Sequence, residues 1–381
     1  MRDYILITYK VRALLLMMLL AVVLGSCSDD SDKVGGESDL LQLVPYTSEM
    51  VDYTPSTTRA VTLPTGYTEY TGPNSIGVYT TTASEAPDKV RTFSYVNSAW
   101  NSQVSVTNTM QYYIYGYMPV NDNTTCTISK RSENEDYSTG AVLNFTNLPP
   151  VMAEDFSVIT GVQQVSSANP SANPEESVSL TAGNFSYVGR ASGSNFVCLM
   201  LDHLYSCIRF NFKVDDTYSN LRTIKLKEVK LKTVNLYTDP LTVTMKTGEA
   251  YTVAWGNGTS STPDFITLFA PENGSEVKLP SVSDTDADHA VKIDGYFAPL
   301  SDVANNLVLE CKYDVYDKNM TTEHPDGNLV RANCVATNKL PASSLVAGVN
   351  QRTSLTLTVS PTYLYVLSDP DLDNPTVVIS L

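Results

Sequence analysis

Residues 111–119 read Gln-Tyr-Tyr-Ile-Tyr-Gly-Tyr-Met-Pro, and this stretch decides the fold class. Tyrosine occupies every second position from 113 to 117, whereas Ile114 and Met118 point the opposite way along an extended chain. Aromatic residues favour strands, and apolar groups on both sides predict a strand inside a β-structure. Pro119 ends the strand, because proline has no amide hydrogen to donate to a neighbouring strand.

The same alternation continues outward from this stretch. Residues 207–214 and 307–315 alternate apolar with polar side chains, as strands with one wet face do. Residues 224–231 change phase once, which predicts a β-bulge near Lys227–Glu228. Residues 93–100 form a further strand candidate that turns at its Asn-Ser pair, Asn97 and Ser98. Other strand candidates are residues 76–79, 155–161, 196–201 and 355–359.

No long stretch has the 3.6-residue period of a helix, so we expect an all-β fold with few, short helices. The β-rich body begins at Ala60 and is long enough for two domains. A run of small residues near position 190 predicts the boundary between them. The expected domains are therefore residues 60–193 and 194–381.

The charge and the motifs exclude several classes of function. The formal net charge is −16, which disfavours nucleic acid and anionic membrane surfaces as partners. The sequence has no Gly-x-Ser-x-Gly, no His-Glu-x-x-His and no phosphate-binding loop. We therefore expect no enzyme activity and no cofactor.

Two groups of residues are candidates for a catalytic or metal site. His203 is expected to begin a strand and to have a structural role, since the three histidines lie far apart in the sequence. The alternating Asp284, Asp286 and Asp288 lack the glycine and glutamate of a calcium-binding EF-hand loop. We expect an acidic loop there and no metal site.

The cysteines carry no metal or redox motif, because no Cys-x-x-Cys is present. We expect those of the body to be mostly buried free thiols that behave as small apolar groups. A bridge between Cys311 and Cys334 is the alternative. The cysteines of the body are Cys126, Cys198, Cys207, Cys311 and Cys334.

The N-terminus has the pattern of an export signal. Basic residues up to Arg12 precede an apolar run at 13–24, which is shorter than the ~20 residues that span a bilayer. The run ends in Leu-Gly-Ser-Cys, which resembles the lipobox of bacterial lipoproteins. Residues 1–27 are therefore expected to be a lipoprotein signal peptide, and the resemblance implies acylation of Cys27. A plain secretory signal with an incidental cysteine is the alternative.

Both ends of the mature chain contain short apolar segments. Residues 28–59 are interpreted as a polar tether and a removable segment that contains an apolar strand candidate, Leu40–Tyr46. Its acidic start resembles the surface-export signal of Bacteroidetes lipoproteins. At the other end, residues 363–367 and 376–381 are apolar. A terminal strand of this kind can close its own sheet or be given to a neighbouring molecule.

These features in this order resemble the fimbrillins, the pilins of Bacteroidales type V pili. The likeness extends over essentially the whole chain. The matching residues are Cys27, Arg59-Ala60, Ile76–Tyr79, Trp100, Tyr117–Pro119, Asp155-Phe156, Asp202-His203 and Pro361–Leu367.

The resemblance implies two tandem transthyretin-like β-sandwich domains of Greek-key type. It also implies a lipoprotein that is anchored in the outer membrane and cut between Arg59 and Ala60 by an arginine-specific surface protease. The cut would remove a strand containing Leu41 and Leu43, and a donor strand from another pilin subunit would replace it. The donor would come from residues 363–381, and its inserted side chains would be Val377, Ile379 and Leu381.

The function that follows from the resemblance is that of a structural subunit of a surface fimbria that mediates adhesion. The alternative is a monomeric surface lipoprotein that binds glycans or host proteins. The two differ in one requirement, because only the fimbrial subunit needs to be cut in order to act.

Overall fold

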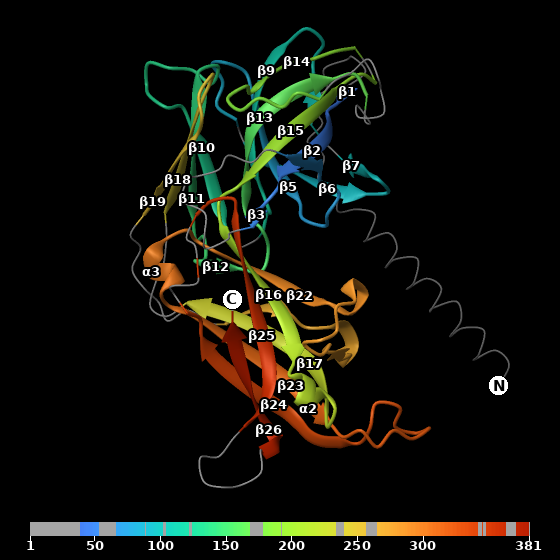
Figure 1. The fold of residues 1–381 in the computed structure, drawn as a ribbon. Coiled ribbons are helices and arrows are strands. Elements are labelled where there is room, and N and C mark those ends of the chain that lie inside the picture. The colour runs from blue at the N-terminus through green and yellow to red at the C-terminus, as the bar shows by residue number, and fades with distance from the viewer. Residues whose placement is uncertain are drawn as a thin grey trace, which may run out of the picture. The chain divides into compact units, whose positions relative to one another are not determined.

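The computed structural model describes residues 39–380 except 53–65, 88, 102–103, 122–123, 168–177, 192, 234–239, 257–264, 342–344, 346–347 and 363–370. Strands dominate the described residues, and α2 (Asp216–Ser219) and α3 (Ser301–Ala304) are four residues long (Figure 1). None of the described helices is long and apolar enough to cross a membrane. The predicted all-β fold with few, short helices is confirmed.

The largest sheet has nine strands and contains the stretch at 111–119. The strands β15 and β2 run parallel, and the other neighbours in the sheet are antiparallel. A separate small ladder joins β1 (Asp39–Leu40) to β8 (Ser105–Val106). In spatial order the nine-stranded sheet contains β4 (Tyr67–Glu69), β2 (Gln42–Ser48), β15 (Phe196–His203), β13 (Ser157–Val165), β9 (Gln111–Met118), β5 (Ile76–Thr81), β6 (Arg91–Val96) and β7 (Ala99–Asn101), with β14 (Ser186–Val188) paired to β9.

The central strand β9 has the predicted two-sided character. Ile114 and Met118 belong to one buried apolar cluster, whereas Tyr115 and Tyr117 belong to another. The strand stops before Pro119, as expected. The sequence pattern of this strand therefore gave both its extent and the side on which each residue lies.

The predicted turn at Asn97–Ser98 joins β6 to β7. Both residues have positive φ angles, 53° and 62°, which is the geometry of the tight turn that suits the twist of a β-hairpin. The predicted bulge is also present, because the pairing of β17 with β23 shifts between Leu226 and Glu228.

A four-stranded sheet packs on the tyrosine side of β9. The rings of Tyr117 and Phe145 meet edge to face with centroids 5.2 Å apart. Figure 1 shows the four strands side by side. They are β10 (Thr125–Ser129), β11 (Gly140–Thr146), β18 (Leu241–Lys246) and β19 (Thr252–Trp255).

Two further sheets enclose the rest of the core, with Phe210 and Leu357 from one and Leu309 and Cys311 from the other. The first has six strands: β12 (Val151–Met152), β22 (Val291–Phe297), β16 (Ser206–Val214), β25 (Gln351–Thr362) and β26 (Asp371–Ser380) in order, with β3 (Val51–Asp52) beside β25. The second has five: β20 (Ile266–Phe269), β17 (Thr223–Thr233), β23 (Leu307–Tyr316) and β24 (Leu329–Lys339) in order, with β21 (Val277–Lys278) beside β17.

The division into domains at 193/194 stays a prediction, because residues 39–381 form one compact unit. The sheets change at a later point: β15 belongs to the nine-stranded sheet, and β16 begins the six-stranded sheet at Ser206. Residues 241–255 then return to the four-stranded sheet through β18 and β19. One domain would then contain the nine- and four-stranded sheets, and the other the six- and five-stranded sheets. For this division we propose a domain boundary at Leu204–Tyr205.

Candidate functional site

The strand β2, which contains most of the apolar segment Leu40–Tyr46, occupies a slot near the edge of the nine-stranded sheet. On one side it pairs with β15 in parallel, from Gln42 opposite Phe196 to Thr47 opposite Leu201. On the other side it pairs with the three-residue strand β4 from Tyr46 to Ser48 only. Residues 42–44 of β2 are therefore held by one neighbouring strand, β15, and by side-chain packing.

The slot buries both faces of β2. Leu41 and Leu43 pack into the cluster that contains Ile114, whereas Val44 and Tyr46 pack into a separate cluster with Cys198. All four of these side chains are at most 6% exposed, and Leu41 directly precedes β2. Burying an apolar side chain of this size contributes about 1.5–3 kcal/mol. An empty slot would expose apolar side chains and the unpaired backbone groups of β15.

Beyond β2 the chain crosses to the six-stranded sheet. The backbone amide of Val51 donates to the carbonyl of Asn350 at 2.9 Å, and β3 runs parallel to the start of β25. The guanidinium of Arg352 donates to Asp52 at 2.6 Å, and this hydrogen bond lowers the pKa of the Asp52 carboxyl. Residues 39–52 are thus attached to two sheets, and their next described neighbour in the chain is residue 66.

His203 lies where β2 ends, and its position corrects the sequence analysis. It is the last residue of β15 and does not begin a strand, because the chain leaves the sheet at Leu204 before β16 starts. Its imidazole is buried, donates through Nε2 to the carbonyl of Ser48 at 2.6 Å and forms an ion pair through Nδ1 with Asp155. The expected structural role agrees with these contacts.

The charged surroundings of His203 favour its protonated form. Burial disfavours the imidazolium, but the charge and hydrogen bond of Asp155, the Ser48 carbonyl and the charge of Asp202 outweigh it, and the pKa of His203 is raised. Asp202 is itself buried, which raises the pKa of its carboxyl, and it accepts from the hydroxyl of Tyr67 at 2.6 Å.

The raised pKa predicts how stability depends on pH. A histidine with a folded-state pKa above the unfolded value of about 6.5 contributes its full stabilisation below pH ~6.5. That contribution is lost as the pH rises through the folded-state value. We expect the urea midpoint of the intact chain to fall more steeply above pH ~6.5 than that of a His203→Gln variant. Parallel midpoint curves for the two proteins would contradict this assignment.

The strand β26 contains the predicted donor residues Val377 and Ile379. In this structure it closes the chain's own six-stranded sheet as an edge strand, antiparallel to β25. It begins at Asp371, earlier than the predicted 376. The hydroxyls of buried Tyr313 and Tyr218 donate to the carbonyls of Pro375 and Leu372 at 2.9 Å and 2.8 Å. These hydrogen bonds hold the first part of β26, where Pro375 cannot donate to the ladder.

The burial of β26 differs from that of β2. Val377 is 7% exposed, but Val378 on the opposite face is 52% exposed. Most of its other described side chains are exposed or half-buried. The tail therefore carries an apolar side chain on each face but buries only one face where it now lies.

The structure describes only part of the predicted site. Leu43, Val377 and Ile379 lie in strands as given above, whereas Leu41 lies between β1 and β2. The remaining predicted residues, Cys27, Arg59, Ala60 and Leu381, and the apolar segment 363–367 lie outside the described residues.

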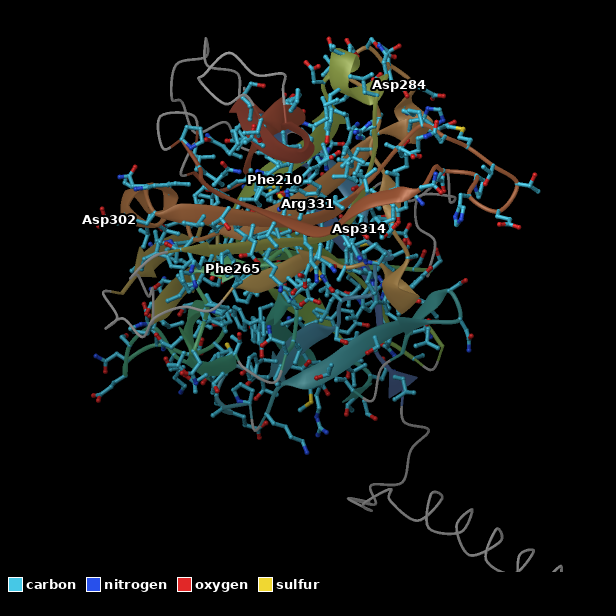
Figure 2. All side chains as sticks on the ribbon, turned by 90° about the horizontal axis from the view of Figure 1, so that it is seen from below. Phe210, Phe265, Asp284, Asp302, Asp314 and Arg331 are labelled. Carbon is cyan, nitrogen blue, oxygen red and sulfur yellow. The ribbon has the colours of Figure 1, made fainter. Side chains whose placement is uncertain are left out.

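The other candidates from the sequence are the cysteines and the acidic loop at Asp284. The five cysteines of the body form no disulfide, so the alternative bridge between Cys311 and Cys334 is absent, and all but Cys126 are buried. Asp284 lies on an outer loop (Figure 2) and pairs with His289 at 3.1 Å. Among the described residues, no group of three or more acidic, histidine or cysteine side chains could hold a metal ion.

Sequence reasoning missed Asn350, which joins the end of β2 to the start of β25. Its side-chain oxygen accepts from the hydroxyl of Ser48 and from the backbone amide of His203, both at 3.2 Å. Its φ angle of 59° is in the left-handed region, which asparagine tolerates better than most residues. Gly348 and Asn350 are residue types that favour a turn, but nothing in the sequence links them to Ser48.

Comparison with known proteins gave matches among solved structures only. No protein-family model matches the chain, and no curated protein matches its sequence. A fimbrial protein from Bacteroides vulgatus is similar at 13% identity and a TM-score of 0.32, over 90% of this chain and 98% of that one. The fimbrial anchor protein of Porphyromonas gingivalis is similar at 10% identity and a TM-score of 0.26, over 89% of this chain and 96% of that one. Both are described as fimbrial proteins.

Proposed function

We propose that this chain is a structural subunit of a surface fimbria and that it polymerises by donor-strand exchange. The observation that carries the proposal is the slot of β2. It holds an N-terminal strand whose apolar side chains are buried on both faces. A single cut between β3 and β4 would separate that strand from the rest of the chain.

Arg59 is the proposed cutting point, because it lies in the sequence between β3 and β4 and matches the fimbrillin motif. After the cut, residues up to Arg59 can leave, whereas the parallel partner β15 stays. A strand from another subunit can then supply both the missing ladder hydrogen bonds and the missing apolar side chains. The ladder bonds contribute ~0.5–1.5 kcal/mol each.

The tail of a second subunit is the proposed donor. Its present place on β25 buries Val377 but leaves Val378 exposed, whereas the slot buries side chains on both faces. Transfer of the tail into a slot would bury both of its faces, whereas its present place buries one. Because the slot and the donor are different surfaces of one subunit, repeated transfer makes an open fibre.

Export and location follow from the N-terminal motif. We propose that Cys27 carries the lipid anchor that holds the uncut chain in the outer membrane until an arginine-specific surface protease cuts it. The partners of the mature subunit are then other pilin subunits, and its place is the fimbria at the cell surface, where it mediates adhesion.

The test is cleavage of residues 28–381 with an arginine-specific protease. The wild-type chain should be cut after Arg59 and form a ladder of oligomers in size-exclusion chromatography. An Arg59→Lys variant keeps the charge, should resist cutting there and should stay monomeric. Monomers after complete cutting at Arg59 would refute the proposal and favour the monomeric glycan-binding lipoprotein, which needs no cut.

A further inference from the structure

The end of the β2 slot is built from polar groups, unlike its apolar floor. Ser48 is buried at this end, with its backbone carbonyl on Nε2 of His203 at 2.6 Å and its hydroxyl on Oδ1 of Asn350 at 3.2 Å. Asn350 also accepts from the backbone amide of His203 at 3.2 Å. His203 and Asn350 are thus hydrogen-bonded to each other and to Ser48, the last residue of β2.

His203 and Asn350 both belong to the part of the chain that stays after a cut at Arg59. The imidazole is fixed from behind, because Nδ1 pairs with Asp155 and lies 3.3 Å from the hydroxyl of Ser157. When β2 leaves, Nε2 loses its acceptor, and Oδ1 of Asn350 loses the hydroxyl of Ser48. A buried donor without a partner costs free energy, so the empty slot end favours an occupant that restores both contacts.

The ladder of β15 cannot set the register of an incoming strand by itself. Backbone hydrogen bonds repeat every two residues, and a strand moved by two residues presents the same faces. The slot end breaks this degeneracy, because only one position along the occupant can place a carbonyl on His203 and a hydroxyl on Asn350 together.

We propose that His203 and Asn350 form a polar end-stop that fixes the register of the strand in the slot and selects one with serine or threonine at the position of Ser48. This inference rests on the proposed function and adds to it the chemistry of the partner strand. The end-stop also sets a minimum length, since an occupant that stops before this position leaves Nε2 of His203 unpaired.

The tail of this chain contains a residue that meets the requirement. Ser380 directly follows the apolar residues Val377, Val378 and Ile379. If Ser380 takes the position of Ser48, then Val378 takes that of Tyr46, which is buried in the slot. The second copy of the chain would thus present both an apolar segment and the required hydroxyl.

The primary test uses the intact chain and needs neither cutting nor assembly. Threonine and valine have nearly the same shape, but only threonine has a hydroxyl. In hydrogen exchange of the β2 amides, we expect Ser48→Val to exchange about tenfold faster than Ser48→Thr, because it lacks the hydrogen bond to Asn350. The ratio should fall to about one when both are combined with Asn350→Gly.

Asn350→Gly removes the side chain but suits the positive φ angle, so the backbone is retained. The matched control is Asn97→Gly, which has a φ angle of 53° in an exposed hairpin turn and should leave the ratio at about ten. Equal exchange of the threonine and valine variants, or a ratio unchanged by Asn350→Gly, would overturn the end-stop.

Fibre assembly supplies a separate readout on the tail. After a cut at Arg59, Ser380→Thr should polymerise like the wild type, and Ser380→Val should polymerise more slowly. If no variant polymerises but the exchange ratio holds, the end-stop stands and donor-strand assembly fails. If all polymerise equally, the selection of a hydroxyl in the partner strand is wrong.

Discussion

Replacing Leu43 by aspartate is expected to open the β2 slot without any proteolytic cut. Leu43 is 4% exposed and packs in the apolar cluster beneath the slot. A carboxylate there loses the apolar contact and would be desolvated among the apolar side chains of the cluster. We expect the substitution to cost of order 3–5 kcal/mol of the stability with which β2 is held in its slot. The strand β2 has one long neighbour, β15.

The expected result is self-association of the uncut protein, because an open slot can accept the tail of a second copy. Light scattering coupled to size exclusion should show oligomers for Leu43→Asp. The matched control is Gln42→Asp, which adds the same charge at the adjacent, exposed position and should remain monomeric. Circular dichroism distinguishes slot opening from global unfolding. A folded, monomeric Leu43→Asp chain with protected β2 amides would show that β2 is not displaceable.

Replacing Val377 by aspartate is expected to abolish polymerisation of the cut protein. Val377 is the buried member of the apolar pair in the tail, and a carboxylate at this position cannot enter an apolar slot without a large desolvation cost. The slot of the variant remains intact. The cut Val377→Asp chain should therefore accept a donor but be unable to give one.

This asymmetry gives a mixing experiment. Adding cut Val377→Asp chains to cut wild-type chains should shorten the oligomers, because each variant molecule ends the fibre that it joins. Asn374→Asp is the control, since Asn374 is exposed in β26. With Ser380 at the position of Ser48, Asn374 would take the position of Gln42, which is also exposed. If the variant alone polymerises as well as the wild type, then another segment of the chain is the donor.

The sequence pattern predicted individual strands well. The alternation at 111–118 gave the face of each side chain, the phase change at Lys227 gave the bulge, and Asn97–Ser98 gave the hairpin turn. Each of these features depends on residues adjacent in the chain. Local chemistry, such as the missing amide of proline or the left-handed tolerance of asparagine, is sufficient to specify them.

Which strands pair with each other could not be predicted from the sequence pattern. β18 and β19 join the sheet of β10 and β11, although they follow β17 in the chain. Leu241, Val243 and Met245 on β18 alternate like the apolar residues of many other strands in the sequence. A period of two shows on which face of a strand each side chain lies, but not which strand is its neighbour. The pattern therefore could not predict the sheet to which β18 and β19 belong.

The candidate site shows the same division. The amino-acid sequence by itself determined that Leu41 and Leu43 belong to an apolar strand and that the tail ends in another. Only the tertiary structure decided that β2 lies parallel to β15, that it is buried on both faces, and that His203 and Asn350 meet at Ser48. The reason is distance along the chain: Ser48 lies 155 positions from His203 and 302 from Asn350. No local rule relates residues so far apart, and the packing of the sheets brings them together.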